Sequence, residues 1–116
     1  MTRDPDGFLP LTPIAFEILL ALGEDERHGY AVLQAMEARS SGSVSLHAGT
    51  LYRALARLVD RGLLEELDEA PDPDTDERRR YYRRTELGRR VASAEARRLA
   101  SQVGSARAQG LLGEAG

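Results

Sequence analysis

Apolar and polar residues recur with helical spacing in several stretches of the chain, most clearly in residues 45–62. Each residue turns a helix by about 100°, so these spacings separate one apolar face from one cationic face. Ser45 is the predicted N-cap, and Gly62 is the predicted residue at which this helix ends. The apolar face is Leu51, Leu55 and Leu58, and the opposite face is Thr50, Arg53, Ala54, Arg57 and Arg61.

A first helix is predicted earlier in the chain, with Thr12 as its N-cap. Pro13 occupies its first position, where the missing N–H of proline costs nothing, and the helix ends at Gly23. Apolar side chains surround this helix almost completely. Because so small a chain has few elements to cover it, we expect a second subunit to contact Ile14 and Ile18.

The second helix in chain order is predicted from about His28 to Arg39. Tyr30, Leu33 and Met36 mark its apolar stripe, with Val32 beside them. The SSGS segment that follows is a flexible break before the third helix.

After Gly62 the pattern changes to two short segments of strand length, residues 63–67 and 79–84. The segment between them is acidic, and Pro71 and Pro73 cannot donate hydrogen bonds to a neighbouring strand. We therefore predict a long polar loop there. Two strands around such a loop form a hairpin of the wing type.

Thr85 is the predicted N-cap of a last helix that runs to about Arg107. Its apolar residues are spaced as in a heptad repeat, which favours contact with a second subunit. The alternative is that the stripe covers the protein's own core. The stripe consists of Ala92, Ala96, Leu99, Val103 and Ala106, of which the first four are the predicted dimer contacts.

The predicted fold is α+β and mostly helical, a winged helix-turn-helix with three helices, a two-stranded wing and a C-terminal dimerisation helix. Four parts are expected. They are a flexible leader (1–10), a winged-helix DNA-binding domain (11–85), the dimerisation helix (86–108) and a flexible tail (109–116).

The net charge of −3 is distributed unevenly along the chain. Nine acidic residues and one arginine lie between positions 60 and 77, whereas ten arginines and two glutamates lie between 78 and 107. All sixteen cationic side chains are arginine, which makes bidentate contacts with phosphate or guanine. The negative total therefore does not exclude a nucleic-acid partner.

The composition argues against an enzyme. Cysteine is absent and there are only two histidines, so a zinc site would need carboxylate ligands. The acidic segment lacks the glycine and glutamate of a calcium loop, and no catalytic motif is present. We predict no catalytic activity, no metal and no cofactor. The longest apolar run is too short to span a membrane and no signal peptide is evident, so we expect a cytoplasmic protein.

A winged helix that binds a protein partner without DNA is the alternative function. Net negative charge and the acidic loop would suit it. A protein-docking face carries exposed aromatic or aliphatic side chains, whereas the front of the third helix carries arginines and a threonine. This difference favours DNA.

Three segments carry a resemblance to a known family. HGYAVLQAM at 28–36, AGTLYRALARLVDRGLL at 48–64 and RRRYYRRTELGRR at 78–90 resemble the signatures of the PadR family of bacterial transcriptional regulators. The resemblance implies a homodimer that binds a palindromic operator in double-stranded DNA. It also implies repression of a nearby promoter, and it permits a small aromatic or drug-like effector between the subunits. The residues themselves do not say whether the chain binds an effector, or whether it represses or activates.

By position, the resemblance implies that Tyr30 reaches a phosphate and that Thr50, Tyr52 and Arg53 lie at the DNA surface. The helical projection agrees for Thr50 and Arg53. It places Tyr52 at the flank, where the hydroxyl contacts phosphate or the ring closes the edge of the core. The helical face adds Arg57. The other predicted DNA contacts are Ser45, His47, Arg78, Arg79 and Arg80.

The chain departs from the family pattern at two places. His47 and Ala48 stand where the family usually has a proline, so the third helix begins less rigidly and His47 is available to DNA. Arg84 stands where the family commonly has an apolar residue before Thr85, and the sequence does not assign it a role.

Overall fold

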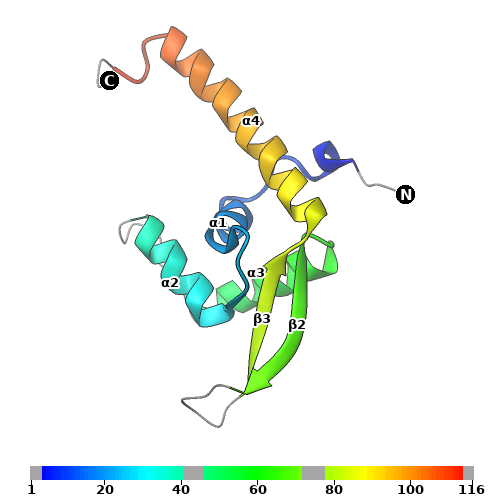
Figure 1. Cartoon of the computed structure of the whole chain (residues 1–116). Coiled ribbons are helices and arrows are strands. Elements are labelled where there is room, and N and C mark those ends of the chain that lie inside the picture. The colour runs from blue at the N-terminus through cyan, green and yellow to red at the C-terminus, as the bar shows by residue number, and fades with distance from the viewer. Residues whose placement is uncertain (1–3, 41–45, 72–77, 114–116) are drawn as a thin grey trace.

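The computed structural model describes residues 4–40, 46–71 and 78–113, with the backbone alone at 68–71 and 78–79 (Figure 1). Four α-helices and a three-stranded antiparallel sheet make up the described fold, which confirms the predicted class. In chain order the elements are η1 (Pro5–Phe8), α1 (Pro13–Leu22), β1 (Arg27–His28), α2 (Gly29–Arg39), α3 (Ala48–Asp60), β2 (Leu64–Pro71), β3 (Arg78–Arg84) and α4 (Glu86–Ala108).

α1 begins and ends where the sequence predicts. The Thr12 side chain accepts a hydrogen bond from the backbone N–H of Ala15, and Pro13 opens the helix. Gly23 has a φ of 56°, a conformation that favours glycine, and it ends the helix.

α2 has a different buried stripe from the predicted one. Gly29, Val32 and Met36 face the core, whereas Tyr30 is 56% exposed. The stripe is shifted because α2 packs on α1 through its Val32 and Met36 side, and the aromatic ring of Tyr30 is left at the surface.

α3 starts later than predicted. Ala48 is its first residue and His47 its N-cap, so the prediction of Ser45 as N-cap is wrong. His47 makes no side-chain capping hydrogen bond, and Ser45 lies outside the described residues. The predicted end is confirmed, because Gly62 adopts a φ of 81° and its N–H donates to the carbonyl of Val59.

The sheet contains one strand more than the predicted wing. β1 pairs with β3 through Arg27 opposite Tyr82 and His28 opposite Tyr81, giving the order β1-β3-β2. A strand of two residues is too short to show an alternating period, so the sequence does not predict it. β2 also extends to Pro71, opposite Arg78, so this proline ends the strand and does not belong to the predicted loop.

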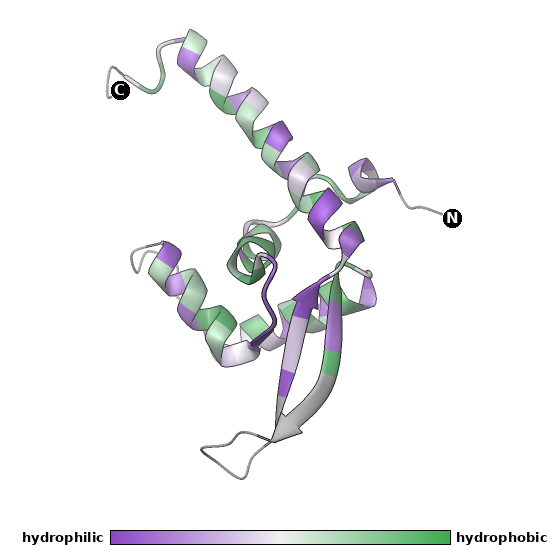
Figure 2. Ribbon diagram, in the orientation of Figure 1, coloured by the Kyte–Doolittle hydropathy of each residue, from purple (hydrophilic) through white to green (hydrophobic). Residues whose placement is uncertain are grey.

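α1 lies at the centre of the fold and contacts α2, α3, α4 and β3 (Figure 1). This arrangement explains its nearly continuous apolar surface, because elements of the same chain cover most of it. Hydrophobic residues are accordingly concentrated on α1 and on the elements around it (Figure 2). The fully buried side chains include Ile18, Leu19, Leu22, Val32, Met36, Leu51, Leu55, Leu63 and Val91.

The segment before α1 is part of this packing. η1 contacts α4, and Phe8 and Leu9 pack against the core. The sequence around Pro5 and Gly7 is polar and shows no helical period, so it does not predict η1 or the contact of η1 with α4. The structure therefore connects the start of the chain to α4.

Candidate nucleic-acid interface

One face of α3 packs into the core, and the opposite face is exposed to solvent. Leu51, Leu55 and Leu58 are no more than 2% exposed. Replacing a buried leucine by alanine typically costs about 2–5 kcal/mol, so three of them hold the rotation of this short helix firmly. Arg53 and Arg57 consequently point to the surface, as the helical projection predicts.

Thr50 and Arg53 form the centre of the exposed face. The Arg53 Nη2 donates to Thr50 Oγ1 at 3.4 Å, one helical turn away. This long hydrogen bond turns the Arg53 guanidinium towards Thr50. An exposed arginine with a hydroxyl neighbour presents donors that suit phosphate oxygens or the O6 and N7 atoms of guanine.

A groove of about 340 Å³ lies between α3 and the start of α1. Ile14 and Ala15 contribute apolar surface, and Arg53 and Arg57 lie along the α3 side. Arg61, at the C-cap of α3, also lines the groove, but its guanidinium lies 5.0 Å from the centre of the Phe8 ring. This cation–π contact joins the end of α3 to the segment before α1, so Arg61 is engaged within the chain.

The start of α2 continues this surface. A Cβ at Gly29 would lie 2.6 Å from the ring of Tyr52 and 2.8 Å from its hydroxyl, so glycine alone allows this close approach. Tyr52 is nevertheless 48% exposed, and Tyr30 lies exposed in the same first turn of α2. The Tyr52 hydroxyl thus sits beside a helix N-terminus, where backbone N–H groups favour phosphate.

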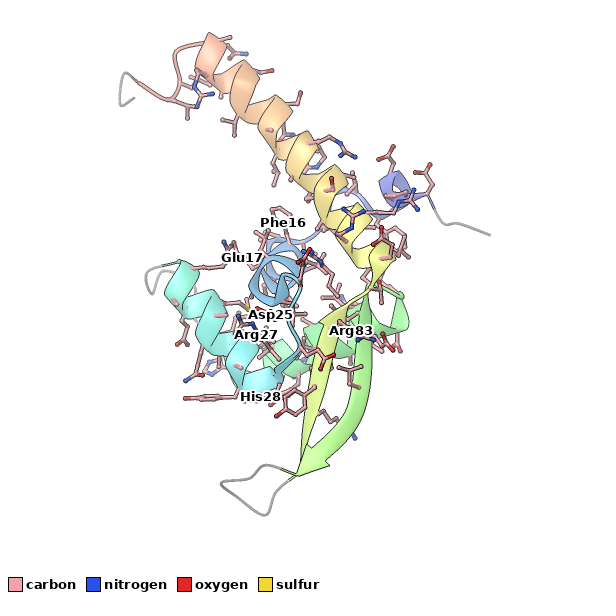
Figure 3. All side chains as sticks on the ribbon, viewed as in Figure 1. Phe16, Glu17, Asp25, Arg27, His28 and Arg83 are labelled. Carbon is pink, nitrogen blue, oxygen red and sulfur yellow. The ribbon has the colours of Figure 1, made fainter. Side chains whose placement is uncertain are left out.

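The first turn of α2 is held by His28. Its Nδ1 accepts from the backbone N–H of Ala31 at 3.1 Å, and its ring packs edge-on against Tyr81 of β3 at 5.7 Å (Figure 3). The histidine therefore links the N-terminus of α2 to the wing.

Two arginines of the wing, Arg80 and Arg83, are paired with acids. Arg80 lies 3.2 Å from Glu66, on the same side of β3 as the buried Tyr82. Burial, reinforced by Glu66, raises the pKa of the Tyr82 hydroxyl. On the other side of β3, Arg83 contacts Glu65 and Glu26 at 2.7 and 3.2 Å, and the Glu65 hydrogen bond raises its pKa.

Comparison with known proteins bears on this site. The model of the transcriptional regulator PadR-like family matches residues 18–94. The chain belongs to the PadR-like family. Membership confirms a DNA-binding transcriptional regulator rather than a module for protein interaction.

Solved structures of similar fold agree with this PadR-like assignment. RosR of H. salinarum is 26% identical with a TM-score of 0.65, covering 82% of this chain and 79% of that one. A PadR family transcription regulator from Clostridium difficile R20291 is 22% identical, with a TM-score of 0.69 over 83% and 96%. Bacillus subtilis PadR in complex with operator DNA is 20% identical, with a TM-score of 0.64 over 73% and 47%. No curated protein matches significantly.

The PadR-like structure brings most of the predicted DNA contacts to one surface. Ser45 and the side chains of Arg78 and Arg79 lie outside the described part of the chain. Arg80 is described, on the wing. The residues that gather at α3 and the start of α2 are Tyr30, His47, Thr50, Tyr52, Arg53 and Arg57.

The residues predicted for dimer contact divide into two groups. Ile18 and Ala92 are 0% and 6% exposed, so they belong to the core of the single chain. Ile14 and Leu99 are half-buried, and Ala96 and Val103 are exposed. Leu99 and Val103 belong to the C-terminal half of α4. This half projects beyond the rest of the fold (Figure 1).

Glu95 is a structural residue of the PadR-like fold that the sequence did not indicate. It is 2% exposed, and its carboxylate accepts from the backbone N–H of Leu11 at 2.8 Å and from Arg98. The Arg98 hydrogen bond, with that of Leu11, lowers its pKa against the effect of burial. The sequence feature that could have indicated this role is a single acidic residue beside the apolar stripe of the last helix.

Arg84 also has a role in the structure. Its Nη1 donates to the carbonyl oxygen of Leu19 at 3.4 Å, near the C-terminal end of α1. A cation is favourable there because helix carbonyls concentrate negative charge.

Within the described residues, no group of three or more histidines and carboxylates is arranged to hold a metal ion. None of the described helices is both long enough and apolar enough to cross a membrane.

Proposed function

We propose that the protein is a cytoplasmic homodimeric repressor that binds a palindromic operator near the promoter it controls. Each α3 would enter the major groove of one half-site, with the two half-sites about one helical turn apart. The wing would contact the adjacent backbone.

The exposed side of α3 carries the proposal. Three buried leucines fix the helix, and the opposite side offers Thr50, Arg53 and Arg57 without a large apolar side chain between them. Arg53 and Arg57 have no acidic partner among the described residues, in contrast with Arg80 and Arg83 of the wing. Their charges are therefore available to phosphates or bases.

The contacts around α3 would position the helix on the duplex. Tyr30 and the Tyr52 hydroxyl lie at the N-terminus of α2, which suits a phosphate. His47, exposed at the N-cap of α3, has no intrachain capping bond to lose on contact with DNA. Arg80 would exchange Glu66 for phosphate at modest cost, because an exposed ion pair is worth about 1 kcal/mol or less.

The dimer part of the proposal rests on apolar surface that the single chain leaves uncovered. Leu20 of α1 and Val103 of α4 are 36% and 43% exposed, and Phe16 and Leu99 are half-buried. The projecting half of α4 has little of its own chain to pack against (Figure 1). A second copy would cover both helices.

The test is a double variant, Arg53→Ala with Arg57→Ala, measured for affinity to operator DNA. Each lost contact is worth about 1–3 kcal/mol, so we expect affinity to fall at least about thirtyfold with the dimer intact. The control, Arg39→Ala with Arg107→Ala, removes the same charge from exposed positions outside α3 and should bind normally. Unchanged affinity of the first double variant would refute the placement of α3.

A further inference from the structure

A second group of arginines lies on α4, apart from the interface described above. Arg90, Ser93 and Arg97 follow one another at spacings of three and four, so they share one side of the helix. With Arg89 and Pro5 they line a hollow of about 300 Å³. Its lining residues come from η1 and α4, and none of them belongs to α2, α3 or the wing.

The charges around this hollow are only partly neutralised. Arg89 pairs with Glu86 at 2.7 Å. Arg97 Nη1 donates to the Ser93 hydroxyl at 2.8 Å, which orients the guanidinium but leaves its charge uncompensated. Arg90 makes no hydrogen bond or ion pair with any residue that the structure describes. The hydrogen bond from Arg89 and, to a smaller degree, the charge of Arg90 lower the pKa of Glu86. Three arginines therefore line the hollow, and among the described residues Glu86 is the acid that partly neutralises them.

The acids of η1 do not supply the missing charge. Asp4 is the N-cap of η1 and accepts from the backbone N–H of Asp6 at 2.9 Å. Neither carboxylate forms an ion pair with Arg90 or Arg97 in the described structure. The wall that η1 contributes to the hollow is the ring of Pro5, which is uncharged.

We propose that the hollow binds a small anion bearing two phosphate groups. Guanidinium groups form paired hydrogen bonds with phosphate oxygens, and Arg90 and Arg97 lie on the same side of α4, two helical turns apart. Both side chains are long enough to bring their guanidinium groups together onto the adjacent phosphates of one diphosphate. The Ser93 hydroxyl between them accepts from Arg97 and keeps its own O–H for the anion. The volume is at the lower end for ligand pockets, which suits a small ligand.

Binding there would join η1 to α4. η1 leads into Phe8, which lies against Arg61 of α3, and into Leu11, whose N–H is held by Glu95. The anion therefore stabilises the segment that connects α4 to the end of α3. We expect the melting temperature to rise with pyrophosphate concentration, because a ligand that binds only the folded state stabilises it.

Isothermal titration of the full chain with pyrophosphate at low salt tests the proposal. We expect a Kd below about 1 mM for the wild type and binding at least about tenfold weaker for Arg90→Ala. Arg107→Ala is the matched control, because it removes one exposed arginine from the same helix outside the hollow, and it should bind as the wild type does. ADP in place of pyrophosphate shows whether an esterified diphosphate is also accepted.

Three results would overturn the proposal. They are no binding by the wild type at 1 mM pyrophosphate, equal affinity of Arg90→Ala and wild type, and equal losses in Arg90→Ala and Arg107→Ala. Operator affinity is measured in the same variants without pyrophosphate. Arg90→Ala should bind operator normally, so failure of the DNA-binding proposal and failure of the anion site are distinguishable.

Discussion

Gly88 of α4 lies against the backbone of Leu63, so closely that a Cβ at Gly88 would be 2.1 Å from the Leu63 carbonyl oxygen. The same carbonyl accepts from the Thr85 N–H at 3.1 Å, and the Thr85 hydroxyl donates to the carbonyl of Gly62 at 2.7 Å. This joint fixes the start of α4 to the turn that ends α3. α4 also carries the proposed dimer surface. These contacts would therefore set the position of the two α3 helices relative to each other in the dimer.

Replacing Gly88 by alanine should therefore destabilise the protein. The new methyl group meets a carbonyl oxygen of the backbone rather than a flexible side chain, and we expect a loss of about 3 kcal/mol in the free energy of unfolding. Gly104→Ala is the control in the same helix, where a Cβ meets nothing within 4 Å. It should be neutral or stabilise by up to about 1 kcal/mol. Equal denaturant midpoints for the two variants would contradict the close packing of Gly88 on the Leu63 carbonyl.

Glu95 should make the free energy of unfolding depend on pH in the acidic range. Its pKa is lowered in the folded state by Arg98 and Leu11, so its contribution is complete above the unfolded value of about 4.5. The contribution is lost as the pH falls through the lower folded value. Glu95→Gln should cost about 1.5–3 kcal/mol at pH 7, and the difference from wild type should shrink towards pH 3. A constant difference across this range in urea unfolding would contradict the assignment.

Much of the fold was predictable because local chemistry decides it. Thr12, Pro13 and Gly23 bound α1, and Gly62 and Thr85 mark the ends of neighbouring helices through their own hydrogen bonds or φ angles. The stripe of leucines in α3 also determined its orientation. These features need only residues close in the chain, and the sequence displays them directly.

The features that sequence did not predict depend on distant contacts. β1 exists because β3 lies beside it, and η1 is held by α4. Glu95 is buried because it meets the N–H of Leu11, which lies 84 residues earlier. Similarly, Ile18 and Ala92 looked available to a second subunit until the position of α1 at the centre of the fold was known.

Tyr52→Phe separates the two interpretations of Tyr52. The ring would still pack against Gly29, but the hydroxyl beside the α2 N-terminus would be lost. If that hydroxyl contacts a phosphate, operator affinity should fall about tenfold with little change in stability. Tyr81→Phe, on the other side of the wing, should not change the affinity. Normal operator binding by Tyr52→Phe would show that the ring only closes the edge of the core.

Leu99→Asp should produce monomers. Leu99 lies half-buried on the projecting half of α4, and a charge there would oppose contact with a second copy. Ser101→Asp places the same charge on the opposite side of the helix, where the residue is exposed, and should remain dimeric. Sedimentation analysis measures both masses. A dimer mass for Leu99→Asp would exclude this surface from the interface.

The central claim is that the protein recognises a specific DNA sequence through α3. Fluorescence anisotropy with its own upstream intergenic DNA and with a scrambled duplex, at several salt concentrations, tests this claim most directly. We predict tight binding to the upstream DNA, weak binding to the scrambled duplex, and an affinity that falls steeply as salt neutralises the phosphate contacts. Equal weak binding to both duplexes, or no binding to either at low salt, would contradict it.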